Sequence, residues 1–211
     1  MKALLVSGGN PPSKALLMKE AKEADCIIGI DKGIECLYEN KIKPNIIVGD
    51  FDSINPTLLK DIKSKVTEVV KFPEEKDFTD SQLAIEKALD LNAKEIILLG
   101  ATGNRIDHTW ANVGLLYQCL KAGVKAVIKD DKNTLFMVDK DIRLKVNKEP
   151  YFSLIAYGGS VKGLTIKNGK YELNHHDLLP HENISISNEF IGKDVDITFH
   201  SGVLLIAYTN D

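Results

Sequence analysis

The 211-residue sequence predicts an α/β protein in which a parallel-sheet domain is followed by a smaller antiparallel β-sandwich. Up to about residue 130, short β-branched runs alternate with helical patterns, which is typical of βαβ units around a parallel sheet. Beyond residue 130 the chain carries short strand patterns divided by Gly, Asn and Asp turns, a spacing typical of an antiparallel sandwich. We therefore expect one domain over residues 1–130 and a second over residues 131–211.

The first domain is expected to alternate strands and helices from its start. The expected strands are residues 3–6, 26–30, 46–48, 66–70, 95–99 and 126–128, and the expected helices are residues 13–24, 34–39, 56–62, 79–89 and 109–122. Thr79-Asp80-Ser81-Gln82 fits a capping box at one helix start, and Gly123 provides a stop after the last helix. On that last helix, an apolar stripe from Trp110 through Val113 and Leu116 predicts a buried face.

The second domain is expected to consist of short strands. They are residues 134–138, 142–146, 151–156, 161–166, 170–173, 184–187, 195–199 and 203–208. Asn168-Gly169 and Ser201-Gly202 each stand between two strand patterns, so both predict hairpin turns.

Charge and composition exclude several classes of protein. The net charge of −3 arises from 27 basic and 30 acidic residues mixed along the chain, so the basic face that nucleic acid requires is missing. The first apolar run is too short for a signal peptide, and no stretch approaches the roughly 20 apolar residues of a membrane span. The three cysteines lack a C-x-x-C spacing, which suits reduced, packed thiols. We expect a cytoplasmic protein without a nucleic-acid or membrane partner.

The first of three acidic clusters is Gly49-Asp50-Phe51-Asp52-Ser53, directly after a strand pattern. If the chain stays extended there, Asp50 and Asp52 direct their carboxylates to the same side, which suits Mg²⁺. A plain loop is an equal alternative, because Gly, Asp and Ser are common turn residues.

In the second cluster, Asp77 and Asp80 flank Thr79 at an expected helix start. Thr79 can cap the helix, and an acid is favoured there by the helix dipole, so capping alone explains much of this pattern. The second carboxylate favours a ligand role as well. Asp80 is the preferred candidate because it lies on the first turn.

The third cluster is residues 100–108, Gly-Ala-Thr-Gly-Asn-Arg-Ile-Asp-His. Its glycines permit a tight turn, and Arg105 can hold phosphate oxygens in its planar fork. Asp107 can bind a metal or hold Arg105, and His108 can either transfer a proton or cap the following helix. In an open α/β sheet the ends of several strands converge on one crevice, so the three clusters together predict a magnesium-dependent transfer from a nucleotide.

Two further glycine turns follow the first two expected strands: Ser7-Gly8-Gly9-Asn10 and Asp31-Lys32-Gly33. Neither fits a dinucleotide fingerprint or a P-loop. Asp31 is another acid at a strand end and therefore a further candidate for the metal site.

Taken in order, these segments resemble the thiamine pyrophosphokinase family over nearly the whole chain. The family pattern is an Asp-Gly-Gly turn, Gly-Asp-Phe-Asp-Ser, Asp-x-Thr-Asp and Gly-x-x-Gly-Gly-Arg-x-Asp-His, and it appears at residues 31–33, 49–53, 77–80 and 100–108. The resemblance implies that the first domain binds Mg-ATP and that the sandwich completes a thiamine site across a homodimer interface. It also implies that Tyr171 packs on thiamine near a Ser187-Asn188 turn.

The chain departs from the family pattern at two positions. Lys32 replaces the first glycine of the Asp-Gly-Gly turn, where it is a candidate to bring positive charge to the phosphates. Asn104 replaces the second glycine of Gly-Gly-Arg, and asparagine tolerates the left-handed backbone region.

The mechanism implied by the resemblance is an in-line attack by the thiamine hydroxyl on the β-phosphorus of ATP, with release of AMP. The expected metal ligands are Asp50, Asp52 and Asp80. Arg105 is expected to balance phosphate charge, with Asp107 bound or oriented nearby. Three alternatives stay open: the same core acting on a hydroxymethylpterin, a D-x-D glycosyltransferase, and a nucleotide- or thiamine-binding sensor without turnover.

His175, His176 and His181 fit no established metal-ligand spacing. The neighbouring Asn, Asp and Pro residues predict an exposed loop there.

Overall fold

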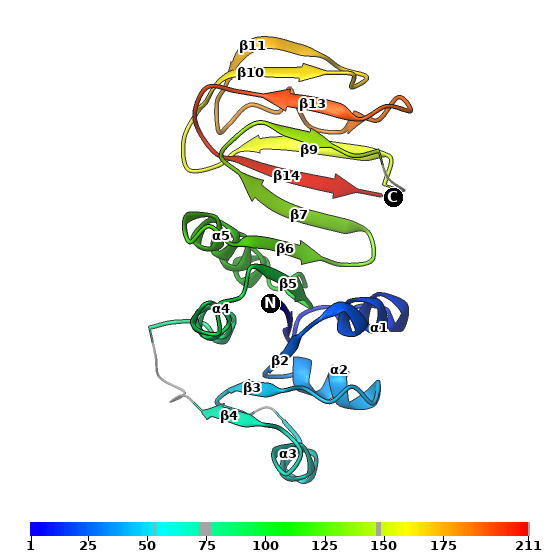
Figure 1. The fold of residues 1–211 in the computed structure, drawn as a ribbon, viewed down its shortest axis with the longest axis vertical. Coiled ribbons are helices and arrows are strands. Elements are labelled where there is room, and N and C mark those ends of the chain that lie inside the picture. The colour runs from blue at the N-terminus through cyan, green and yellow to red at the C-terminus, as the bar shows by residue number, and fades with distance from the viewer. Residues whose placement is uncertain (53, 72–76, 147–148, 211) are drawn as a thin grey trace. The chain divides into compact units, whose positions relative to one another are not determined.

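The computed structural model describes residues 1–52, 54–71, 77–146 and 149–210, so Ser53 of the first acidic cluster lies outside the described residues. The chain divides into two compact units, Met1–Asp131 and Lys132–Asp211. Figure 1 shows helices and strands alternating in the first unit, and strands arranged in sheets in the second.

The first unit is built on a parallel sheet. Its strands are β1 (Lys2–Val6), β2 (Cys26–Ile30), β3 (Ile46–Gly49), β4 (Glu68–Lys71), β5 (Glu95–Leu99) and β6 (Lys125–Lys129). They pair in parallel in the order β6-β5-β1-β2-β3-β4. Every residue of β2 is buried, as expected for a strand with helices on both faces of its sheet. The predicted parallel sheet is confirmed.

Helices cover both faces of this sheet. α1 (Lys14–Glu23) and α2 (Gly33–Glu39) lie on one face, and α4 (Asp80–Asp90) and α5 (Ile106–Lys121) lie on the other (Figure 1). α3 (Pro56–Lys63) packs near α2, because their buried side chains share one apolar cluster.

Side-chain caps set several of the helix starts. The Oγ of Ser13 accepts a hydrogen bond from the N–H of Leu16 at the start of α1. The Oγ1 of Thr79 accepts one from the N–H of Gln82 at the start of α4. The predicted cap at Thr79 is therefore confirmed.

α5 differs from the prediction at its start and in one exposed residue. It begins at Ile106, three residues earlier than expected, because the carbonyl of Arg105 accepts bonds from the N–H and hydroxyl of Thr109. His108 therefore lies within the first turn, so of its two predicted roles the one as helix cap is excluded. Trp110 is 66% exposed, although Val113 further along the predicted stripe is buried.

The second unit consists of two antiparallel sheets around one core. Its strands are β7 (Asn133–Val138), β8 (Ile142–Leu144), β9 (Tyr151–Ala156), β10 (Val161–Lys167), β11 (Leu173–Leu178), β12 (Asn188–Glu189), β13 (Val195–Thr198) and β14 (Leu204–Thr209). One sheet has the order β12-β9-β14-β7 and the other β11-β10-β13-β8. Leu154, Leu164 and Ile206 belong to a buried cluster contributed by both sheets, which confirms the predicted sandwich.

The hairpin predicted at Ser201-Gly202 is wrong. β13 pairs with β10 and β8, whereas β14 pairs with β7 and β9. The chain therefore crosses from one sheet to the other at this turn, a long-range choice that the local turn residues do not encode.

Two strands of the second unit are displaced from their predicted positions. β10 ends at Lys167 and β11 begins at Leu173, so the turn is longer than two residues, and within it the carboxylate of Glu172 accepts a bond from the N–H of Asn168 at 2.8 Å. His175 and His176 therefore lie in a strand rather than in the predicted loop. The strand predicted at residues 184–187 is replaced by the short β12.

Cys26, Cys36 and Cys119 are free, as predicted. Burial raises the pKa of the Cys119 thiol to about 11, so this thiol is protonated at neutral pH and is a poor nucleophile.

Each helix in the described part of the chain is too short or too polar to cross a bilayer.

Glu20 is a buried acid that ties α1 to the sheet. Its side chain is 1% exposed and accepts hydrogen bonds from Lys2 at 3.1 Å and Lys129 at 2.8 Å. Burial alone would raise the pKa of Glu20, but the hydrogen bonds and charges of the two lysines outweigh it and hold the pKa below its usual value. This stabilisation is complete above the unfolded-state pKa of a glutamate and is lost as the pH falls through the lower folded value.

Glu20→Ala should lower the free energy of unfolding by about 3 kcal/mol at pH 7, because two lysines lose a buried partner. The measurement is the midpoint of denaturant unfolding. Glu23→Ala is the matched control: Glu23 also bonds Lys2, at 2.8 Å, but is 53% exposed, so its loss should cost under about 1 kcal/mol. Equal costs would show that Glu20 acts as an ordinary surface ion pair.

Candidate active site

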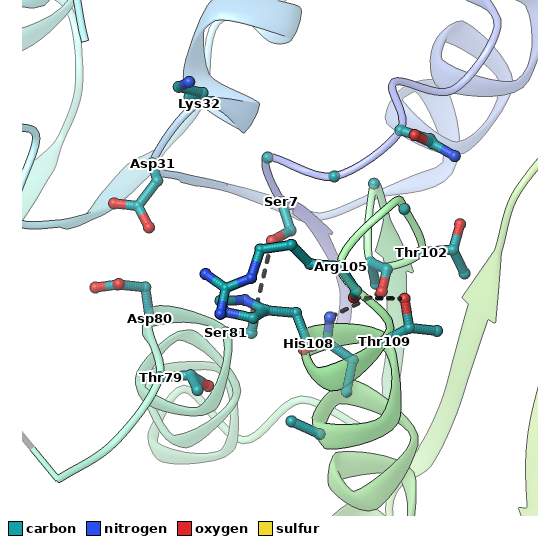
Figure 2. Close-up of a pocket in the computed structure, with 18 of the residues that line it drawn as sticks. Ser7, Asp31, Lys32, Thr79, Asp80, Ser81, Thr102, Arg105, His108 and Thr109 are labelled. Atoms are coloured by element: carbon teal, nitrogen blue, oxygen red, sulfur yellow. Dashed lines mark hydrogen bonds between the residues drawn. The ribbon is translucent and has the colours of Figure 1, made fainter. Parts of the chain in front are cut away.

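The candidate active site lies at the carboxyl edge of the parallel sheet. The strand order reverses between β1 and β5, and open α/β sheets bind ligands at such a point. A cavity of about 560 Å³ opens there (Figure 2). The predicted site residues that line it are Asp31, Lys32, Thr79, Asp80, Asn104, Arg105 and His108.

One wall of the cavity is made by the loops after β1 and β5, whose backbones touch. The N–H of Gly9 donates to the carbonyl of Gly100 at 2.8 Å, and the N–H of Asn10 donates to that of Thr102 at 2.7 Å. Gly100 has a φ of +64°, and a Cβ there would lie 2.2 Å from the carbonyl oxygen of Ser7. Glycine is therefore required at position 100, and the wall presents backbone, as phosphate-binding turns do.

Asp31 and Asp80 place two carboxylates on facing sides of the cavity (Figure 2). Asp31 follows β2 with a φ of +44°, and Asp80 is the first residue of α4, directly after its cap Thr79. Residues at the start of a helix meet the positive end of its dipole, which favours an acid. Carboxylate oxygens that face a common space suit Mg²⁺.

The segment of Asp50 and Asp52 is a tight turn, so of the two predicted alternatives the chain adopts the loop conformation and not the extended one. Phe51 is 5% exposed and packs into the core under α2 and α3, with a φ of +65°. The N–H of Asp52 donates to Oδ1 of Asp50 at 3.0 Å. Burial of Phe51 thus bends the chain, and neither acid lines the cavity.

This turn nevertheless lies beside the cavity. A Cβ on Gly49 would be 2.0 Å from Oδ1 of Asp31, so the chain passes directly against the Asp31 carboxylate. Asp77 is exposed and, unlike Asp80, lies outside the cavity lining.

Arg105 reaches toward the acidic side of the cavity (Figure 2). Its Nε and Nη2 donate to the two carboxylate oxygens of Asp107, at 3.3 and 2.6 Å. These bonds hold the pKa of the Asp107 carboxyl below its usual range. Of the two roles predicted for Asp107, the structure shows the one in which it holds Arg105.

The two departures from the family pattern leave the backbone unstrained. Lys32 has φ −59° and ψ −19°, an ordinary right-handed helical conformation. Asn104 does not belong to the non-glycine residues with positive φ, which include Asp31 and Phe51 in the described part of the chain. A glycine is therefore not needed at either position.

Two buried polar side chains support the site and were not predicted. Ser81, on the first turn of α4, places its Oγ 3.2 Å from the Oγ of Ser7. Asn112 on α5 donates from Nδ2 to the carbonyl of Ala101 at 2.8 Å. The signal for Asn112 was a polar residue between apolar neighbours on a helix, which is costly to bury without a partner.

In the second unit, the structure brings Tyr171 and Asn188 together. The buried Asn188 side chain accepts a bond from the N–H of Tyr171 at 3.0 Å and donates to its carbonyl at 2.6 Å. Ser187 precedes it with a φ of +55°, and its N–H donates to the hydroxyl of Ser153. Tyr171 is thereby held by its backbone while the residue is 55% exposed, and the ammonium group of Lys170 lies over its ring, 5.4 Å from the ring centroid.

The donor set of the first unit fits Mg²⁺ shared with a phosphate. Among the described residues, no group of three or more His, Cys, Asp and Glu side chains could hold a metal alone. Mg²⁺ in nucleotide sites commonly takes one or two carboxylates, with phosphate oxygens and water as its other ligands. Asp31 and Asp80 meet that requirement.

Comparisons with known proteins agree with this architecture. The family model described as "Thiamin pyrophosphokinase, catalytic domain" matches residues 17–128, and that described as "Thiamin pyrophosphokinase, vitamin B1 binding domain" matches residues 139–204. The chain is 33% identical over 187 residues to the thiamine pyrophosphokinase of Bacillus subtilis, covering 87% of each chain.

Solved structures match over the full length. The crystal structure of the Bacillus subtilis thiamine pyrophosphokinase superposes with a TM-score of 0.89 at 29% identity, covering 100% of both chains. A thiamin pyrophosphokinase family protein from Enterococcus faecalis does so with a TM-score of 0.89 at 30% identity, again covering 100% of both chains. With a catalytic-domain model and a vitamin B1 binding-domain model matched in turn, and two solved structures matched along their whole length, this chain belongs to the thiamine pyrophosphokinase family, a family of ATP-dependent diphosphotransferases.

Proposed function

We propose that this protein transfers the diphosphoryl group of ATP to the hydroxyl of thiamine, giving thiamine diphosphate and AMP. The observation that carries the proposal is the single cavity in which Asp31 and Asp80 face each other beside Arg105 and a backbone wall. Two acids with a guanidinium are the groups that metal-assisted phosphoryl transfer uses.

Asp31 and Asp80 are the residues proposed to hold Mg²⁺, with Asp50 and Asp52 in the adjoining turn as the further acids of this edge. When bound, Mg²⁺ neutralises charge on the phosphates of ATP. Thr79 fixes the start of α4, so the position of Asp80 depends on its cap.

Arg105 is proposed to bind the phosphate oxygens, where its charge is most favourable as negative charge develops. Asp107 restrains the guanidinium through two hydrogen bonds and so reduces the entropy lost when a phosphate binds. Asn104 and His108 line the same cavity and are proposed to contact the nucleotide.

The second unit is proposed to bind thiamine. Tyr171 offers an exposed aromatic face to the cationic thiazolium ring, and cations are attracted to such faces. Ser187 and Asn188 would orient that contact, since the Asn188 side chain bonds both the N–H and the carbonyl of Tyr171. This arrangement favours thiamine over the hydroxymethylpterin alternative.

The test is chromatographic analysis of products after incubation with ATP, Mg²⁺ and thiamine, with a hydroxymethylpterin in parallel. Equal amounts of AMP and thiamine diphosphate are expected. AMP formed only with the pterin would keep the donor site and change the acceptor. Tight binding of ATP and thiamine without any product would identify a sensor instead of an enzyme.

We further propose a cytoplasmic homodimer. Large apolar side chains are exposed on both units: Ile106 (74%) and Trp110 (66%) on the first, and Tyr171 (55%) and Ile191 (53%) on the second. Exposed apolar groups of this kind favour association. Light scattering on a sizing column should give twice the chain mass of 23.3 kDa, and a mass of 23.3 kDa would contradict the dimer.

Tyr171→Ala should raise the KM for thiamine by about 10-fold to 100-fold and leave the KM for ATP nearly unchanged, since an aromatic contact of this kind contributes about 1–3 kcal/mol. Tyr171→Phe is the matched control, because it keeps the ring, and its thiamine KM should stay within about threefold of the wild type. Equal changes in both KM values for Tyr171→Ala would assign Tyr171 a structural role.

A further inference from the structure

Lys32 is a cavity-lining cation whose side chain forms no ion pair or hydrogen bond with any residue that the structure describes. Arg105, on the other side of the cavity, differs from Lys32 in having a partner, because its guanidinium forms an ion pair with Asp107. A flexible ammonium group without a partner, next to a site for a highly charged anion, is available to bind that anion. The position therefore carries a charge that the family pattern, with glycine there, does not supply.

The backbone of Lys32 is fixed although its ammonium group is not. Its right-handed helical conformation places it as the N-cap of α2. Its stem lies against the loop after β1, because a Cβ on Gly8 would be 2.9 Å from the Cβ of Lys32. The lysine thus projects from the junction of two loops that line the cavity.

The neighbours of Lys32 indicate which phosphates it meets. Lys32 directly follows Asp31, which faces Asp80 across the cavity, whereas Arg105 comes from the loop after β5 (Figure 2). In the proposed reaction the diphosphoryl group is transferred, and Mg²⁺ held by Asp31 and Asp80 would neutralise negative charge on that group, so the acids mark its end of the nucleotide. A residue adjoining Asp31 lies at that end of the nucleotide.

We propose that Lys32 binds the diphosphoryl group that is transferred, and not the phosphate that leaves in AMP. This inference rests on the proposed function, because it requires ATP as donor and thiamine diphosphate as product. Lys32 then determines affinity for every ligand that carries the diphosphoryl group, on either side of the reaction.

The test is equilibrium binding by titration calorimetry of ATP, AMP and thiamine diphosphate to the wild type and to Lys32→Gln. We expect the Kd of Lys32→Gln to rise about 10-fold for ATP and for thiamine diphosphate, the effect of losing one charge-assisted hydrogen bond. The Kd for AMP should stay within about twofold. With EDTA replacing Mg²⁺ the same ratio for ATP is expected, since Lys32 contacts the phosphate itself.

Two matched variants accompany this comparison. Lys32→Arg keeps the charge and should restore ATP affinity to within about threefold of the wild type. Lys41→Gln removes the same charge from an exposed lysine between α2 and β3, outside the cavity lining, and should leave all three Kd values unchanged.

Unchanged ATP affinity in Lys32→Gln would overturn the inference, and AMP weakened as strongly as ATP would place Lys32 at the leaving phosphate instead. If the wild type makes thiamine diphosphate and Lys32→Gln binds all three ligands as the wild type does, the inference is overturned and the proposed function stands. A wild type that binds ATP through Lys32 but forms no thiamine diphosphate would overturn the proposed function alone.

Discussion

Asp80→Asn should lower kcat by about 1,000-fold or more, with little change in unfolding free energy. Asp80 faces Asp31 across the cavity, and an amide in its place neither balances a divalent cation nor binds it comparably. The fold should survive, because the change removes only a dipole interaction of about 0.5 kcal/mol while the cap from Thr79 persists. Steady-state kinetics with saturating ATP and thiamine measures kcat.

The matched control is Asp90→Asn at the other end of the same helix. Asp90 is exposed and is the last residue of α4, so this change removes the same charge far from the cavity. We expect kcat within about twofold of the wild type, because Asp90 lies outside the cavity lining. The helix should also stay stable, because an acid near a helix C-terminus contributes nothing favourable there. Near-normal kcat in Asp80→Asn would remove Asp80 from the proposed metal site.

Arg105→Ala should lower kcat/KM for ATP by about 100-fold, the cost of losing one well-placed cation or donor in a transition state. The residue lines the cavity, is the N-cap of α5 and contributes no side-chain cap, so helix stability should change little. Arg105→Lys keeps the charge without the planar fork and should recover only part of the loss.

Asp107→Asn separates the two roles predicted for Asp107. If Asp107 acts by holding Arg105, the variant should lose only about 3-fold to 10-fold in kcat/KM, since the guanidinium is still present. Combined with Arg105→Ala, it should then add almost nothing. A loss as large as that of Arg105→Ala, or an additive double variant, would mean that Asp107 contacts a ligand directly.

The local patterns of the chain predict its elements well for physical reasons. Strand and helix periodicities, and the cap at Thr79, depend on residues within a few positions of one another, so a short window contains the needed information. Errors arose where distant contacts decide the outcome. Ser201-Gly202 looks like a hairpin turn, yet β14 pairs with β7 and β9 because the core of the sandwich requires it there.

The sequence by itself determined the fold class, the kind of chemistry and most of the residues that line the cavity. Only the tertiary structure decided which acids face each other: Asp31 and Asp80 meet across the cavity, whereas the Asp50–Asp52 turn, with Phe51 buried, lies beside Asp31 and outside the lining. The local sequence pattern predicts which side chains come directly after each strand. Which of those side chains line the same cavity depends on the order of the strands in the sheet and on which neighbouring side chains are buried in the core.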